Sequence, residues 1–79
     1  MNKETRQRLE ELHCRLMEVS YELNEIAEAE QEKFDNAPEN LQESERVQMW
    51  QECAEAITSI CDDIDSAADE LQDDVISVY

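Results

Sequence analysis

The only histidine of the chain is the first candidate for chemistry. Glu10 and His13 have Glu-x-x-His spacing, which places both side chains on one face of a helix. Di-iron and di-manganese helical bundles use two such pairs together with further inward-facing glutamates. A single chain supplies one pair, so only a dimer could complete the set. We therefore interpret Glu10 as a solvated acid beside a histidine at a bundle edge, and we expect no metal and no cofactor.

Two further patterns approach known sites without completing them. Asp63, Asp65 and Ser66 have part of the spacing of a calcium loop, but that loop also needs a glycine and a third ligand position. His13 directly precedes Cys14, so the two side chains point in different directions and cannot pair as base and nucleophile. We expect no catalytic residues and a protein that is not an enzyme.

The cysteines indicate a compartment and no disulfide framework. Cys14, Cys53 and Cys61 are odd in number and lack CxxC spacing. Residues 1–7 are polar, unlike a secretory signal, and no apolar run reaches the length of a membrane span. Because cytoplasmic thiols stay reduced, we expect free thiols in a cytoplasmic protein, with disulfide or metal roles as less favoured alternatives.

Acidic side chains dominate the composition. The formal net charge is −16, from 22 acids and 6 bases, and the twelve acids after Pro38 accompany a single base, Arg46. Direct binding to nucleic acid or to an anionic membrane is not expected, because both need a basic surface. The charge instead favours partners that are themselves basic.

The acids near the end of the chain form the main candidate binding surface. Each acid taken alone is best interpreted as part of a solvated helix face. Collectively, rows of carboxylates on a helical rod can imitate nucleic-acid phosphates and occupy a basic groove of another protein. The predicted acidic face comprises Asp62, Asp63, Asp65, Asp69, Glu70, Asp73 and Asp74.

A narrower stripe is a second candidate surface. Cys14, Met17 and Tyr21 are spaced by three and four residues, away from the main apolar pattern of their helix. Met and Tyr are enriched at contact surfaces. The stripe is interpreted either as extra packing inside an oligomer or as a docking surface for another protein.

The elements that carry these residues are two long helices. The chain has no Gly and one Pro, and helix-forming residues dominate it. We predict an all-α domain over residues 1–79, with helices over 3–35 and 41–77 and a hinge over 36–40. Asn36 can end the first helix in a left-handed conformation, and Asn40 and Ser44 are alternative caps of the second.

Heptad spacing predicts how these helices assemble. Apolar residues recur at steps of three and four in both, and small positions (Val47, Ala54, Cys61, Ala68, Val75) alternate with large ones in the second. The stripe is too wide for one neighbour, so we expect an antiparallel hairpin that dimerises into a four-helix bundle. The predicted oligomer core comprises Leu9, Leu12, Leu16, Val19, Leu23, Ile26, Trp50, Ile57, Ile60, Ile64 and Leu71.

Charge placement favours the antiparallel arrangement. Lys3, Arg6, Arg8 and Arg15 crowd the start of the first helix, whereas residues 62–74 carry seven acids and no base. Each cluster opposes the dipole of its own helix. Folded antiparallel, the basic start lies beside the acidic end and each offsets the other.

The hinge also carries a family resemblance. Residues 34–46 read Phe-Asp-Asn-Ala-Pro-Glu-Asn-Leu-Gln-Glu-Ser-Glu-Arg. This segment resembles the Phe-Asp-Asn-x-Pro-Glu-x-Leu-Gln-x-Ser-Glu-Arg-like hinge of small acidic helical proteins encoded by phages and prophages of Gram-positive bacteria, with a likeness that extends over about residues 25–71. Trp50, Cys53 and Cys61 depart from the plainer second helix of that family.

The resemblance implies a setting more than a mechanism. Small acidic phage proteins are often inhibitors of host defence, anti-CRISPR proteins among them, or of host nucleic-acid enzymes. The leading hypothesis is an inhibitor, in the cytoplasm of a bacterial host, that covers a basic surface of a host protein and possesses no nucleic-acid-binding activity of its own. The alternative is a structural coiled-coil adaptor whose charge only maintains solubility.

Overall fold

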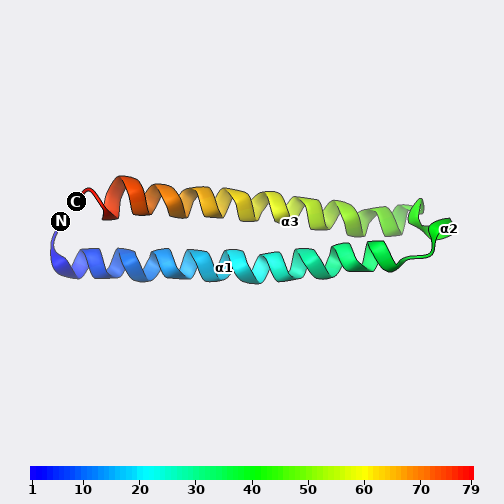
Figure 1. Ribbon diagram of the computed structural model, residues 1–79, viewed down its shortest axis with the longest axis horizontal. Helices are drawn as coiled ribbons and strands as arrows, with labels where there is room; N and C mark the ends of the chain where they lie inside the picture. Colours follow the sequence, from blue (N-terminus) through cyan, green and yellow to red (C-terminus); the bar gives the residue numbers. More distant parts are fainter.

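The computed structural model describes all residues, 1–79, and is helical apart from its ends and short connections. Helix α1 spans Lys3–Asn36, α2 spans Glu39–Gln42, α3 spans Glu45–Glu70, and a π-helical segment, η1, spans Leu71–Ile76. Together they form a rod with Cα extents of 60 × 16 × 13 Å (Figure 1). The prediction of an all-helical, coiled-coil-like protein is confirmed.

Helix α1 begins at a capping side chain and ends before a proline. The Asn2 side chain accepts a hydrogen bond from the Thr5 backbone N–H at 2.8 Å, which satisfies one free donor of the first turn. At the other end, Ala37 leaves the helix in an extended conformation, as the residue before a proline prefers. No residue has positive φ, so the expectation of a left-handed cap at Asn36 is wrong: the chain turns through extended residues instead.

The bend contains a helical turn of its own, α2, which shortens the predicted second helix. The long helix starts at Glu45 rather than at residue 41, because Ser44 is extended and its hydroxyl accepts a hydrogen bond from the Val47 N–H at 3.4 Å. Glutamine side chains hold the bend together. Gln42 donates to the Ala37 carbonyl at 3.2 Å, and Gln48 donates to the Gln42 carbonyl at 2.6 Å.

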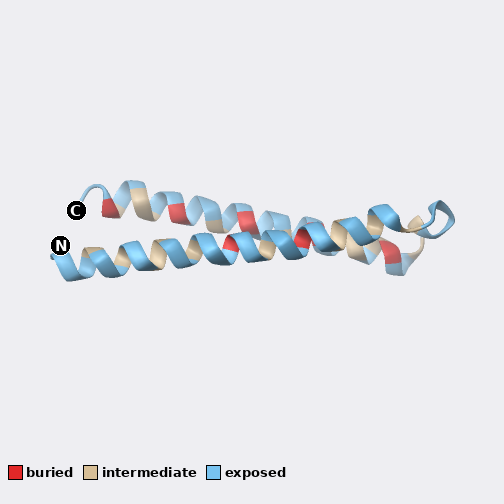
Figure 2. Ribbon diagram, turned by 60° about the horizontal axis from the view of Figure 1, so that its bottom comes forward, coloured by how far each residue is buried: buried red, intermediate tan, exposed pale blue.

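Helices α1 and α3 lie side by side and run in opposite directions, with both chain termini at one end of the rod (Figure 1). The buried residues of α3 recur every seven positions and are small, as predicted, which lets the two backbones approach closely. They are Val47, Ala54, Cys61 and Ala68. The buried residues of α1 are Ser20 and Ala27 (Figure 2).

The end of α3 departs from the heptad pattern. The α-helix stops at Glu70, not at residue 77, and η1 widens the next turn by one residue. Ile76 is therefore buried where the heptads predicted Val75. The Arg6 guanidinium donates a hydrogen bond to the Ile76 carbonyl, which ties the start of α1 to this segment.

Candidate protein-binding surfaces

Large apolar side chains of α1 and α3 gather on one side of the rod. We call this side the apolar face and define it by the eleven residues predicted as the oligomer core. A hollow of about 350 Å³ is lined by Leu12, Arg15, Leu16, Val19 and Leu71, which shows that α1 and α3 contribute to the same side. Heptad spacing extends this face along both helices. Leu9, Leu23 and Ile26 lie seven residues from Leu16 or Val19, Trp50, Ile57 and Ile64 lie at multiples of seven from Leu71, and Ile60 flanks Ile57 and Ile64.

The residues of the apolar face are not enclosed within the chain. Val19, Ile26 and Ile60 are 45%, 51% and 49% exposed, and the other eight are half-buried. The close contact between α1 and α3 runs instead along residues such as Ser20, Ala27 and Ala54. The large side chains therefore border that contact and leave their outer surfaces free.

The acids of α3 and η1 are spread around the rod. Asp62 and Asp65 line a hollow on the side opposite the apolar face, together with Met17 and Tyr21 of α1. Asp63 follows Ile60 by three residues, which places its carboxylate at the edge of the apolar face. The predicted acidic face is thus divided into two rows. The groove row begins with Asp62 and Asp65, which line the hollow just described, and continues to Asp69; we call this hollow the acidic groove. The edge row comprises Asp63 and Glu70. Asp73 and Asp74 lie exposed in η1.

One of these acids already has a partner within the chain. The Ser20 hydroxyl donates a hydrogen bond to an Asp65 carboxylate oxygen at 2.7 Å. The two ion pairs of the structure, Arg8–Glu11 and Glu30–Lys33, both lie within α1. Every acid of α3 and η1 therefore lacks an ion-pair partner, and all except Asp65 also lack a side-chain hydrogen bond.

The stripe of Cys14, Met17 and Tyr21 divides between two places. Met17 and Tyr21 lie beside Ser20 and Asp65 in the groove, where their contact surface adjoins carboxylates. Cys14 lines a separate shallow hollow on α1 with Gln7, Glu10 and Glu11. The predicted docking stripe is thus part of the acidic groove at one end and a bare helix surface at the other.

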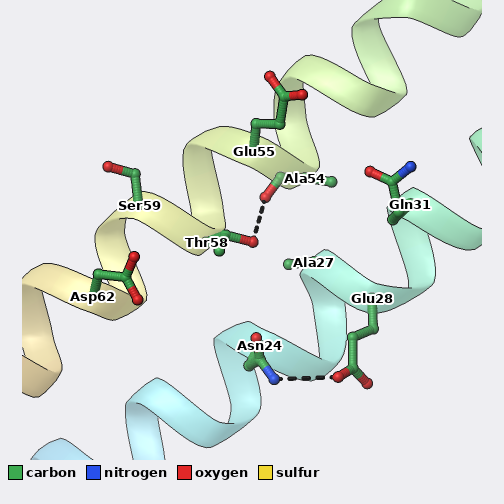
Figure 3. Close-up of a pocket in the computed structure, with 9 residues that line it drawn as sticks. All are labelled: Asn24, Ala27, Glu28, Gln31, Ala54, Glu55, Thr58, Ser59 and Asp62. Atoms are coloured by element: carbon green, nitrogen blue, oxygen red, sulfur yellow. Dashed lines mark hydrogen bonds between the residues drawn. The ribbon is translucent and has the colours of Figure 1, made fainter.

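A second hollow continues the groove toward the bend (Figure 3). It measures about 420 Å³ and exists because Ala27 and Ala54, which lie between the helices, fill little space. Glu28, Glu55 and Asp62 surround it with no base among its lining residues. Asn24 donates to Glu28 at 3.3 Å and Thr58 donates to the Ala54 carbonyl at 2.9 Å, so part of its polar lining is internally bonded.

Sequence reasoning did not anticipate this groove. Its one signal is that Ala27 and Ala54 occupy heptad positions that become opposite only when the helices pair. The groove can attract cationic groups, because three carboxylates line a hollow that lacks a countercharge.

The thiols and the histidine form no recognisable reactive site. All three cysteines are free; Cys14 and Cys53 are exposed, and buried Cys61 donates from its thiol to the Ser20 carbonyl at 3.4 Å. No group of three or more His, Cys, Asp or Glu side chains is placed to hold a metal ion. None of the helices combines the length and apolar character that crossing a membrane requires.

Comparison with known proteins identifies no relative. No protein family, no curated protein and no solved structure matches the chain. The features of the chain that bear on its function are therefore the apolar face and the acidic groove.

Proposed function

We propose that the protein is a binding protein that inhibits another protein by covering its basic, nucleic-acid-binding surface. The observation that carries this proposal is the absence of any ion-pair partner for the acids of α3 and η1. Acids that served only to orient the helices would be expected to meet the bases of α1. Carboxylates left free along one helix are available to a basic partner.

The groove row has a geometry that suits such a partner. Asp62, Asp65 and Asp69 follow one another at three and four residues, so they form a row along one side of α3. Their rise along the helix axis is about 5 Å per step. Met17 and Tyr21 adjoin this row, and they add apolar contact surface for the stems of Arg and Lys side chains.

The proposed class of target rests on the sequence of the bend. Residues 34–46 resemble the hinge of small acidic phage and prophage proteins, so we propose a bacterial host protein of defence or nucleic-acid handling as the target. The inhibitor would act in the host cytoplasm, without a cofactor and without binding nucleic acid itself.

The proposed working unit is a dimer in which two hairpins form a four-helix bundle. Only 7 of 79 residues are buried in the single chain, and a core that small supplies little stability by itself. Association through the apolar face would bury the large side chains that each chain leaves uncovered.

Affinity for the target should depend steeply on salt if the acids make the contact. The protein would be immobilised, incubated with host lysate and eluted with rising NaCl. A captured protein supports the proposal only if added chain displaces it from DNA or RNA. The test variant carries Asp62→Asn, Asp69→Asn, Asp73→Asn and Asp74→Asn, and we expect it to lose this displacement while keeping its helicity.

A matched control removes the same charge from α1. Glu18, Glu22, Glu25 and Glu32, none of which lines the hollow in Figure 3, would be changed to Gln, and this variant should retain most of the displacement activity. Equal loss in both variants would show a response to net charge alone, and full activity of the α3 variant would rule out its acids as the contact.

A coiled-coil adaptor is the second candidate function, and the apolar face favours it. In that case another helical protein would pack on this face, and the charge would serve solubility. Binding would then change little between low and high salt, and it would be lost on substitution of Val19 and Ile60 by Ser rather than on loss of the acids.

A further inference from the structure

We infer that a second copy covers the apolar face with its α3 against this chain's α1, so that both bends lie at the same end of the bundle. This inference rests on the dimer proposed above and specifies its orientation. The face is large enough for a stable dimer. A rectangle of 60 × 16 Å covers about 960 Å², and standard interfaces bury roughly 800 Å² per partner.

Contacts within the chain establish which residues of α1 and α3 share a level, that is, the same height along the axis of the rod. The Arg6 guanidinium bonds to the Ile76 carbonyl, and the Cys61 thiol bonds to the Ser20 carbonyl. In both contacts the two residue numbers add up to 81 or 82. When both bends lie at the same end, the same relation holds between α1 and the partner's α3.

These levels place opposite charges next to each other at the edge of the dimer. Arg15 lines the apolar hollow, so its guanidinium lies at the edge of the apolar face, and it has no ion-pair partner in the chain. It would lie level with about residue 66 of the partner, between the partner's Asp63 and the partner's Glu70. Both of these acids belong to the edge row and are unpaired.

Within two to three residues of these levels, large side chains meet small and large neighbours in turn. Leu12 would lie near the partner's Ala67 and Ile26 near the partner's Cys53, whereas Val19 would lie near the partner's Ile60. Alternation of large and small residues across an interface lets the layers interdigitate without voids.

The opposite orientation, with the bends at opposite ends, is a poorer match. There α1 would pack on the partner's α1 and α3 on the partner's α3. With the contact centred near Val19, Leu12 would meet the partner's Ile26 and Arg15 would pair with the partner's Glu22. Because levels in α1 and α3 are linked by the sum of 81 or 82, Asp63 would then face the partner's Asp63 and Glu70 the partner's Ala56, and neither carboxylate would gain a countercharge.

This orientation has a consequence for the inhibitor. Both copies of η1, with Asp73 and Asp74, would lie at the same end of the bundle, beside the acids at the C-terminal end of α3. The dimer would then present one end with twice the acidic charge. A basic surface of a target would engage two chains at once, giving two chains per target site.

Charge reversal tests the orientation. Sedimentation equilibrium would measure dimerisation of Arg15→Glu, of Asp63→Arg and of the two combined, with circular dichroism as a check of helicity. Each single change should weaken dimerisation about tenfold, because every dimer contains the contact twice. The combination should restore it, since the exchanged charges again attract.

The matched comparison is Arg15→Glu combined with Glu22→Arg. Restoration by Glu22→Arg and not by Asp63→Arg would overturn the orientation in favour of bends at opposite ends. Single variants that dimerise like the parent would refute the pairing of Arg15. A wild-type chain that stays monomeric at about 100 µM, which means a dimerisation free energy weaker than roughly −5 kcal/mol, would refute the dimer. The displacement assay tests inhibition separately.

Discussion

Helices α1 and α3 contribute differently to the same rod. Five of the six bases belong to α1, which also contains both ion pairs, whereas α3 has Arg46 alone and no ion pair. At their contact α3 provides small residues at every seventh position, and α1 opposes them with Ser20 and Ala27. The difference is one of degree: α1 has ten acids and five bases, whereas α3 has eight acids and one base, so a larger share of the carboxylates of α3 lacks a countercharge.

A single substitution at the contact between α1 and α3 should have the largest effect on the stability of the rod. Ala68 is 0% exposed, so Ala68→Glu would bury a carboxylate without a partner. We expect the free energy of unfolding to fall by about 4 kcal/mol or more, seen as loss of helicity in urea titrations followed by circular dichroism. The control is Ser66→Glu, two residues away and exposed, which should stay close to wild type. Comparable losses in both variants would mean that Ala68 is not at a tight contact.

The two N-terminal caps test whether the start of α3 matters more than the start of α1. Ser44→Ala removes the acceptor of the Val47 N–H, and we expect a loss of about 1 kcal/mol in the free energy of unfolding. Val47 is buried, so fraying there opens the packed contact. Asn2→Ala should cost less, because α1 begins at an exposed terminus where fraying stays local. Urea titrations at one fixed protein concentration compare the two, and a larger effect of Asn2→Ala would reverse the ranking.

Much of the fold follows from composition and spacing. Without Gly and with a single Pro, the chain has few alternatives to helix, and α1 ends one residue from its predicted limit because Pro38 prevents its continuation. The bend was less predictable. Its side-chain bonds from Gln42 and Gln48 to backbone carbonyls depend on a three-dimensional turn that has no signal in heptad spacing.

The surfaces were predictable in composition but not in placement. A stripe three heptad positions wide does not reveal which edge meets the chain's own second helix, so the contact at Ser20 and Ala27 could not be distinguished from one at Leu16 or Leu23. The hydrogen bond from Ser20 that occupies Asp65 depends on this choice. The π-helical turn that buries Ile76 instead of Val75 likewise has no sequence signature.

The smallest effect concerns the charges at the ends of the two helices. Asp73 and Asp74 lie in η1 near the negative end of the α3 dipole, and Glu4 lies in the first turn of α1, at a positive end. Neutralising Asp73 and Asp74 to Asn should raise the free energy of unfolding by a few tenths of a kcal/mol, whereas Glu4→Gln should lower it by a similar amount. Thermal unfolding at fixed protein concentration in low salt measures both, and both changes should shrink in 1 M salt through screening. The hydrogen bond from Arg6 to the Ile76 carbonyl supplies a positive charge at that end, so a gain near zero for the Asn variant would mean that this guanidinium already offsets the two carboxylates. A loss of stability in the Asn variant would instead mean that the acids of η1 form stabilising contacts, and these two carboxylates would no longer be free for a partner.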